Sequence, residues 1–433
     1  MHTVNKREVH TALKKKGQQA WVDLTFRYGK TFRSNGLVLT CEPEVVRTLL
    51  MDKAHTEVRS VVHKLLARFP GANGILFLDG DPWLKRVKAV MPAFHRNHVD
   101  GYAASLQKLT LDRAKQWEDR GLEPDLFSAV QQLGAASVLK MGYGLDPDHP
   151  LAAQLGAALI DYKQTTMSPD PRRRFDEFGA GIVTKLPWLT AAVLSFRKKM
   201  ARVREVVRQL MADKGIDRSD WGWLAQLHDA GLSEEEVALE LNHLYGAFNA
   251  IDYIVTAALY ELSRNPRLMA AIQGELESVL PDGKVPGRED LSRMPLMNGF
   301  MLEILRLYPV SMGISRRTGA SLEIGGEQLP AGTEVLIVLY ALHHHPDFWD
   351  RPGELLPERW MTSAEPKVQF SYLPFLEGPR KCIGRSMAEM QLQIVLSTLL
   401  RKYDLNVFAD ATIPPFMVPR FATPLPFGVR RRR

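Results

Sequence analysis

The stretch Phe375-Leu-Glu-Gly-Pro-Arg-Lys-Cys-Ile-Gly384 contains one of only two cysteines in this chain of 433 residues. Its glycines predict tight turns and a close approach of the backbone to the sulfur of Cys382. The residues from Arg385 onward have the apolar spacing and the strong helix formers of a long helix. Cys382 is therefore predicted to lie at a helix N-terminus, near Arg380, Lys381 and Arg385. Amide N–H groups and positive charge at such a place favour a metal-bound thiolate.

The composition excludes several classes of protein. Hydrophobic residues make up 45% and charged residues 24%, as in ordinary soluble globular proteins. The net charge of +7 is spread along the chain without a basic stripe interleaved with aromatic residues, so no nucleic-acid binding is expected. Two cysteines cannot build a disulfide framework, which fits a reducing cytosol, and Cys41 is interpreted as a small buried apolar residue at a strand end.

No membrane segment is expected from the sequence. No uncharged apolar stretch reaches the length that spans a bilayer, and the first ten residues lack the apolar core of a signal peptide. The sequence therefore predicts a soluble, cytoplasmic protein without a transmembrane anchor.

The pattern along the chain predicts a mainly helical protein with a small β portion, organised as a single domain over residues 1–433. Ser233 and Glu236 form a capping box that opens a helix of roughly 30 residues, which ends at Asn265-Pro266. The predicted portions follow: β-rich at about 20–45, 310–340 and 405–428, and helical at about 92–310 and 340–402.

The loop around Cys382 contains every fixed position of the signature Phe-x-x-Gly-x-Arg-x-Cys-x-Gly. It resembles the haem-ligating loop of the cytochrome P450 family, and the resemblance extends from about residue 20 to residue 428. It implies the cytochrome P450 fold, with haem b between a long central distal helix and the proximal loop and helix of the cysteine ligand. It also implies that Cys382 is the axial ligand of the haem iron, in a cofactor-binding loop that includes Phe375 and Gly384.

A second motif, Glu303-Ile-Leu-Arg306, places two opposite charges on one apolar helix face. Buried charges need partners, and the later segment Pro357-Glu-Arg359-Trp offers a second arginine. In the family, matching residues form a buried network near the haem loop. The resemblance therefore gives Glu303, Arg306 and Arg359 a structural role in assembling the haem pocket.

Haem carries two propionates, so the pocket needs cations. Arg380 is one candidate, and Arg316 matches a strand arginine of the family. Arg317 is the alternative, because a shift of one residue turns a strand side chain to the other face. Trp83 resembles a tryptophan that, in the family, is followed four residues later by a basic residue. Here that later position is valine, so Arg86 and Lys88 both stay open as its replacement.

The run His343-His344-His345 resembles a family loop that precedes the Pro-Glu-Arg segment. Three consecutive side chains cannot converge on one ion, so no metal cluster is predicted there.

The centre of the long helix departs from the family pattern. Counting back from Asn265-Pro266 aligns Asn249 and Ala250 with the acid and the threonine that relay protons for O–O cleavage. An amide has no accessible pKa and alanine has no hydroxyl group. Asp252 is a candidate for a displaced catalytic acid, and water or a substrate hydroxyl group is the alternative source of protons.

The resemblance implies a haem-thiolate monooxygenase that oxidises a lipophilic small molecule with O2 and two electrons. Two alternatives remain: a peroxide-using enzyme, either a peroxygenase or a hydroperoxide isomerase or dehydratase that uses Asn249, and a non-catalytic haem sensor. A basic proximal face implies an acidic electron donor, a ferredoxin that is served by its reductase. The enzyme is expected to be a monomer. The residues of that face are Lys381, Arg385, Lys85 and Lys88. The segments near 55–80, 155–195, 309–315 and 416–424 and the centre of the long helix are expected to select the substrate. Several of them are apolar, which favours a lipophilic substrate, but the sequence does not identify it.

Overall fold

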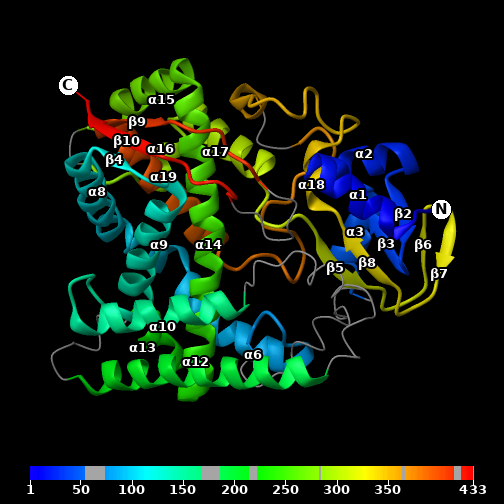
Figure 1. Cartoon of the computed structure of the whole chain (residues 1–433), viewed down its shortest axis with the longest axis horizontal. Helices are drawn as coiled ribbons and strands as arrows, with labels where there is room; N and C mark the ends of the chain where they lie inside the picture. Colours follow the sequence, from blue (N-terminus) through cyan, green and yellow to red (C-terminus); the bar gives the residue numbers. More distant parts are fainter. Residues whose placement is uncertain are drawn as a thin grey trace. The chain divides into compact units, whose positions relative to one another are not determined.

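The computed structural model describes two compact units, each of which is considered by itself (Figure 1). Helices dominate and the strands are short, so the protein is mainly α with a small β portion, as predicted. The described residues are 1–53, 74–166, 186–213, 222–281, 284–362, 366–413 and 421–432. The first unit comprises Met1–Ser60, Leu106–Val130 and Ile251–Arg433, and the second comprises Val61–Ser105 and Gln131–Ala250.

The largest sheet of the first unit has the strand order β1-β2-β3-β8-β5. Its hairpin of β2 and β3 was predicted, and it turns through Asn35 and Gly36, both with positive φ (51° and 76°). Two central residues of this kind give the turn whose twist matches that of paired strands. The five strands are β1 (His2–Thr3), β2 (Thr31–Ser34), β3 (Leu37–Thr40), β8 (Glu334–Ile337) and β5 (Ile314–Arg317).

The predicted β-rich stretch at 20–45 is wrong on both sides of this hairpin. Residues Gln19–Tyr28 form helix α2, and Pro43–Met51 form helix α3. In α2, Ala20, Trp21 and Leu24 are all buried, and this spacing of i, i+1 and i+4 is helical. Helix α1 (Lys6–Lys16) packs beside α2, which gives that apolar face a partner.

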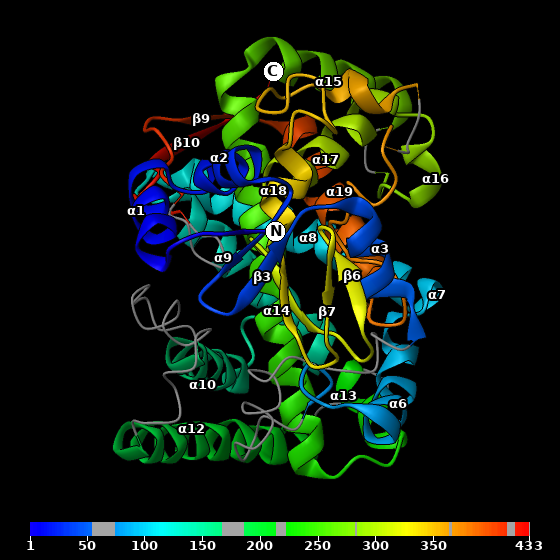
Figure 2. The ribbon, with the colours of Figure 1, turned by 90° about the vertical axis from the view of Figure 1, so that its right-hand side faces the viewer.

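Strand register separates two neighbouring arginines. Strands β5 and β8 pair antiparallel, with Arg316 opposite Val335 and Arg317 opposite Glu334. Successive side chains of a strand point to opposite faces, so the two arginines face different surroundings. The next hairpin, yellow in Figure 2, joins β6 (Leu322–Ile324) to β7 (Glu327–Leu329) through Gly325 and Gly326, both with positive φ.

A three-stranded sheet has the order β4-β10-β9. Strands β9 and β10 belong to the β portion predicted near 405–428 but extend a few residues outside it, whereas β4 lies at 122–123, in a stretch predicted to be helical. Trp117 of helix α8 packs edge-on against Phe427 with ring centroids 5.4 Å apart, which anchors the sheet to that helix. The elements are α8 (Ala103–Arg120), β4 (Leu122–Glu123), β9 (Tyr403–Val407) and β10 (Phe427–Arg431).

The long predicted helix is α14 (Glu234–Arg264), with 31 residues. Its capping box forms as expected: the Ser233 N–H donates to a Glu236 oxygen at 2.9 Å, and the Glu236 N–H donates to the Ser233 hydroxyl at 3.4 Å. Pro266 then begins helix α15 (Pro266–Val279), so the predicted stop is also confirmed.

The second unit is built almost wholly from helices, among which α10 and α12 lie side by side (Figures 1 and 2). The ring of Trp223 lies 5.5 Å from that of Phe94 and 5.8 Å from that of Phe248, so aromatic packing joins three of its elements. Its elements are α6 (Gly80–Val90), η1 (Met91–Phe94), α7 (Arg96–Asp100), α10 (Pro150–Thr166), α12 (Leu186–Ala212), α13 (Trp223–Asp229) and parts of α9 (Leu126–Tyr143) and α14.

The remaining elements of the first unit carry the candidate site. Both carboxylate oxygens of Glu275 accept backbone N–H groups, from Leu296 and Met297, at the start of helix α17. This contact satisfies two of the N–H groups that a helix N-terminus leaves open. The elements are α16 (Arg288–Leu291), α17 (Pro295–Leu307), α18 (Leu339–His344), η4 (Pro357–Trp360) and α19 (Arg385–Lys402). None of the described helices is both long and apolar enough to cross a membrane.

Candidate active site

The loop that carries Cys382 is closed by its own backbone. The Cys382 N–H donates to the Phe375 carbonyl at 2.8 Å, and the Lys381 N–H donates to the Gly378 carbonyl at 3.1 Å. Between them, Leu376 has a φ of 59°, a left-handed conformation that is uncommon for a residue with a side chain. Cys382 is exposed and stands two residues before Gly384, the N-cap of α19. The predicted place of the cysteine before a long helix is therefore confirmed.

Gly378 lets this loop approach helix α3. Its φ is 85°, and a Cβ atom at this position would lie 2.0 Å from the Leu50 carbonyl oxygen. Both the backbone conformation and the available space therefore require glycine.

Replacing Gly378 with alanine is expected to destabilise the fold by more than the cost of its backbone conformation. That conformation alone costs an alanine about 1–2 kcal/mol. The clash with Leu50 adds to this cost, since the atom it meets belongs to the backbone. Denaturant unfolding measures the change. Gly326→Ala is the matched control, because Gly326 also has a positive φ, of 76°, but nothing within 4 Å of its Cβ position. If Gly378→Ala and Gly326→Ala lost equal unfolding free energy, the close approach of Gly378 to the Leu50 backbone would be refuted.

Opposing effects act on the pKa of the Cys382 thiol in this loop. Burial raises the pKa of the thiol, and this effect outweighs the Gly384 and Arg385 N–H groups and the Arg385 charge, all of which lower it. The loop supplies the expected donors, but desolvation is stronger. A bound metal would have to hold the sulfur deprotonated, as metals do with coordinating thiols.

The other cysteine is closed to ligands. Cys41 is fully buried next to strand β3, and burial raises the pKa of its thiol to about 12. The prediction of a small buried apolar residue is confirmed. Of the two cysteines, only Cys382 presents its side chain at a surface.

The other loop residues that were predicted to bind the cofactor lie around Cys382 in sequence. Arg380 and Phe375 are half-buried. The guanidinium of Arg385 lies 5.7 Å from the centre of the Phe375 ring, and its Nε donates to Glu389 at 2.8 Å. The ring of Phe375, at the start of the loop, thus contacts a side chain of the first turn of α19 that is itself fixed by an ion pair.

The strand register places Arg316 and Arg317 on opposite faces of β5, in different surroundings. Arg317 donates from Nε to the Gly332 carbonyl at 2.9 Å and lies 3.6 Å from Glu334, so its charge is already matched. Arg316 is only 4% exposed, and its Nη1 donates to the Ser315 carbonyl at 3.1 Å. Cys382, the arginines Arg380 and Arg316, and the glycine-shaped loop are the parts that a haem thiolate site requires, so the residues present fit this group.

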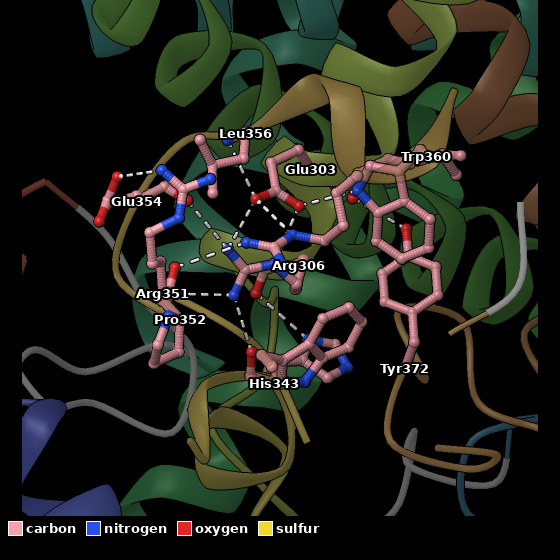
Figure 3. Close-up of polar contacts among 12 residues, drawn as sticks. Glu303, Arg306, His343, Arg351, Pro352, Glu354, Leu356, Trp360 and Tyr372 are labelled. Carbon is pink, nitrogen blue, oxygen red and sulfur yellow. Dashed lines mark hydrogen bonds and ion pairs between the residues drawn. The ribbon is translucent and has the colours of Figure 1, made fainter. Parts of the chain in front are cut away.

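Glu303 and Arg306 form the predicted buried pair on α17, and both side chains are 0% exposed (Figure 3). Arg306 donates to both Glu303 oxygens, from Nε at 2.9 Å and from Nη2 at 2.7 Å. Arg359 donates from Nε to Glu303 Oε1 at 3.2 Å. The three residues named from the sequence are therefore brought together. Their role in assembling a haem pocket remains a proposal.

The rest of this network was not predicted. The indole N–H of Trp360 donates to Glu303 at 2.8 Å, and the Leu356 N–H donates to the same carboxylate at 3.2 Å (Figure 3). Arg306 also donates to three backbone carbonyls, those of His343, Pro352 and Glu354, at 2.7–3.2 Å. A tryptophan directly after Arg359 was the available signal for Trp360, since a buried indole N–H usually finds an acceptor.

The three consecutive histidines have separate surroundings. His343 is fully buried, and burial together with the Arg306 charge lowers its pKa to about 3, so it is neutral at ordinary pH. His344 stacks on Tyr340 with ring centroids 4.0 Å apart, and His345 lies beside Phe348. Among the described residues, no three His, Cys, Asp or Glu side chains form a group suited to a metal ion.

The candidates on helix α6 belong to the second unit. Trp83 is half-buried and Lys88 is exposed. Arg86 is only 9% exposed, and it donates to Glu240 at 2.6 Å and to Glu236 at 2.5 Å. Two carboxylates already match the charge of Arg86, which leaves Lys88 as the stronger candidate for a propionate contact.

The centre of α14 is helical throughout, although the side chain of Asn249 lies outside the described part. Ala250 is half-buried and Asp252 is 4% exposed. Around the centre of α14, the residues His243, Gly246, Ala247 and Ala250 form a stripe at helical spacing that is at least partly exposed, as is Ile251 beside it. Of the substrate segments predicted near 55–80, 155–195 and 416–424, the structure describes residues 74–80, 155–166, 186–195 and 421–424, and the other positions lie outside the described residues.

Comparison with known proteins adds a family match and three relatives. The family model of cytochrome P450 matches residues 188–426. The cyclooctat-9-en-7-ol 5-monooxygenase of Streptomyces melanosporofaciens is 28% identical over 390 residues, which are 87% of this chain and 81% of the relative. Cyclooctatin synthase from the same organism is 26% identical, and the match covers 87% of this chain and 82% of the relative. Cytochrome P450 4A10 of Rattus norvegicus is 24% identical, and that match covers 89% of this chain and 79% of the relative.

Proposed function

Because this chain belongs to the cytochrome P450 family and is a haem-thiolate monooxygenase, we propose that Cys382 is the axial ligand of its haem b. The observation that carries the assignment is the contrast between the two cysteines: Cys41 is fully buried, whereas Cys382 is exposed in a glycine-shaped loop before a helix. The haem, when bound, supplies the activation of O2 with two electrons.

Four further residues complete the proposed haem site. Arg380 and Arg316 supply cations for the propionates, because one is half-buried in the ligand loop and the other is buried on a strand. Trp83 and Lys88 are proposed as the contribution of α6. Glu303, Arg306 and Arg359 hold the surrounding backbone, and a single catalytic domain over residues 1–433 comprises both units.

Proton delivery is proposed to depend on the substrate or on water. Ala250 lies on the partly exposed stripe of α14 and has no hydroxyl group, and Asn249 cannot donate a proton as an acid does. Asp252 is an acid on the same helix, but it is 4% exposed. These features favour a hydroxyl group brought by the substrate, positioned where a threonine would otherwise stand.

The substrate is lipophilic, and we infer that it carries a hydroxyl group. One relative is named for an alcohol substrate, cyclooctat-9-en-7-ol. Such a substrate would supply the missing alcohol beside Ala250. The electron donor is a redox partner, proposed to be a ferredoxin served by its reductase. The exposed cations Lys381 and Arg385 suit an acidic protein of this kind, although Glu389 offsets part of the Arg385 charge. Lys85 is exposed on α6. The active enzyme is proposed to be a monomer.

Turnover of lipophilic alcohols is expected to require NADH, ferredoxin and ferredoxin reductase. A lipid hydroperoxide given without any donor should be converted at a negligible rate. Product formation by mass spectrometry measures both reactions. Rapid conversion of the hydroperoxide alone, which is lost in Asn249→Ala, would instead assign the peroxide-using alternative. Absence of any product and of any spin-state change with lipophilic ligands would assign a haem sensor.

The same assay tests the source of protons through an analogue that lacks the hydroxyl group. Positioned proton transfer contributes about 10²–10⁴-fold to a rate, so the analogue should yield far less product per electron consumed. Ala250→Thr should restore coupling with the analogue and change little with the alcohol. Equal coupling of both substrates in the wild-type enzyme would show that water supplies the protons.

A further inference from the structure

We propose that His343 is a positioning residue that ties the Glu303–Arg306 pair to the loop of Cys382 and so keeps the thiolate in place. The inference rests on the proposed function in one respect, the assignment of Cys382 as the ligand. The sequence analysis noted the run of three histidines but gave His343 no role in the haem site.

Both ring nitrogens of His343 are used. Nε2 accepts the Leu373 N–H at 2.9 Å, so in the neutral ring the proton lies on Nδ1. Nδ1 is 3.3 Å from the Arg306 carbonyl and can donate to it. The His343 carbonyl in turn accepts from Arg306 Nη1 at 2.9 Å. The histidine and the arginine therefore hold each other by two contacts, and the imidazole passes this fixed position on to Leu373.

Leu373 lies where the chain enters the ligand loop. The Leu376 N–H donates to the Leu373 carbonyl at 3.3 Å, and the Phe375 carbonyl accepts the Cys382 N–H at 2.8 Å. A continuous run of backbone contacts thus leads from the imidazole of His343 to the amide of Cys382. Leu373 is only 3% exposed, so its N–H has no easy access to water if the imidazole acceptor is lost.

Tyr372 reinforces the same entry point (Figure 3). Its ring centre lies 5.6 Å from that of His343 and 4.6 Å from that of Trp360, which itself donates to Glu303. Its hydroxyl group donates to the Leu302 carbonyl on α17 at 3.0 Å. Two adjacent residues, 372 and 373, are therefore fixed to the buried network immediately before the loop begins.

Two substitutions separate the two bonds of the imidazole. Asparagine places an amide group near the position of Nδ1, so His343→Asn keeps a donor for Arg306 and loses the acceptor for Leu373. Glutamine reaches as far as Nε2, so His343→Gln retains that acceptor. His344→Asn is the matched control, because His344 is also buried, at 5% exposed, and its Nδ1 contacts the Tyr340 carbonyl within α18 at 2.9 Å.

The experiment uses the haem-loaded full chain and two readouts. Hydrogen–deuterium exchange by mass spectrometry follows the peptide that spans residues 373–384. The reduced CO spectrum follows the rate at which the thiolate-type complex is lost at a fixed, mildly elevated temperature. His343→Asn is expected to raise both rates about tenfold, because a buried N–H loses its acceptor. His343→Gln should recover most of the wild-type behaviour, and His344→Asn should match the wild type in both readouts, even with a lower Tm.

Three results would overturn the proposal. The first is a His343→Asn variant whose exchange rate and CO-complex lifetime equal those of the wild type. The second is an equal rise of both rates in His343→Asn and His343→Gln. The third is a rise in His344→Asn as large as that in His343→Asn. Failure of the proposed function looks different, because the wild type itself would then lack a thiolate-type CO complex. In that case the exchange readout alone still decides whether His343 fixes the loop.

Discussion

Cys382→Ala is expected to abolish the thiolate-type shift of the Soret band when the reduced protein binds CO. The shift needs a sulfur ligand, and Cys382 is the only cysteine whose side chain reaches a surface. The Glu303–Arg306 network and α19 make no use of the thiol, so the variant should still fold. Dithionite reduction under CO, followed by an absorption difference spectrum, measures the effect.

Cys41→Ala is the matched control for this result. Cys41 is fully buried and its thiol is protonated at ordinary pH, because burial raises its pKa to about 12. The control should keep the complete thiolate-type signal with a small loss of stability. A signal that survives in Cys382→Ala, or that disappears in Cys41→Ala, would show that the ligand is misassigned.

Glu303→Gln is expected to cost about 3–5 kcal/mol of unfolding free energy, the usual range when one partner of a buried ion pair is removed. The carboxylate is 0% exposed and accepts from Arg306, Arg359, Trp360 and the Leu356 N–H. Glutamine leaves two guanidinium groups without a counter-charge. Denaturant unfolding and haem content measure the loss. Asp350→Asn is the control, because Asp350 and its partner Lys367 are both exposed, and it should change stability little.

The effect of Glu303→Gln should also depend on pH. Burial would raise the pKa of Glu303, but Arg306, the Trp360 N–H and Arg359 together hold it below its usual value. A carboxyl group with a lowered pKa stabilises the fold above its unfolded pKa, and this contribution is lost as the pH falls through the folded value. The stability gap between wild type and variant should therefore be full at neutral pH and narrow in acid. A gap that stays constant down to strongly acidic pH would contradict the ion-pair explanation.

The sequence predicted those features that short motifs determine. The capping box of Ser233 and the stop at Pro266 located α14, and the loop motif located Cys382 before α19. Each of these depends on residues close together in the chain. The stretch at 20–30 was misjudged because a short apolar run near a real hairpin fits both periods until its packing partner is known.

The features that the sequence did not predict depend on contacts between distant segments. The choice between Arg316 and Arg317 required the pairing of β5 with β8. The engagement of Arg86 required Glu240, which lies 154 residues away in the chain. The raised pKa of the Cys382 thiol depends on how much water the folded surroundings exclude, and no motif records that quantity.

Arg306 sets the path of a segment to which it does not belong. Its guanidinium group has five N–H donors, and in the structure it makes contacts to Glu303 and to the carbonyls of His343, Pro352 and Glu354. Residues 345–356 contain no helix or strand, so few of their carbonyls have a partner in regular structure. One cation therefore supplies hydrogen-bond donors to this segment, as a neighbouring strand does in a sheet. Lysine, with three donors on one atom, cannot replace this arginine, because it could not reach the carboxylate and these carbonyls at once.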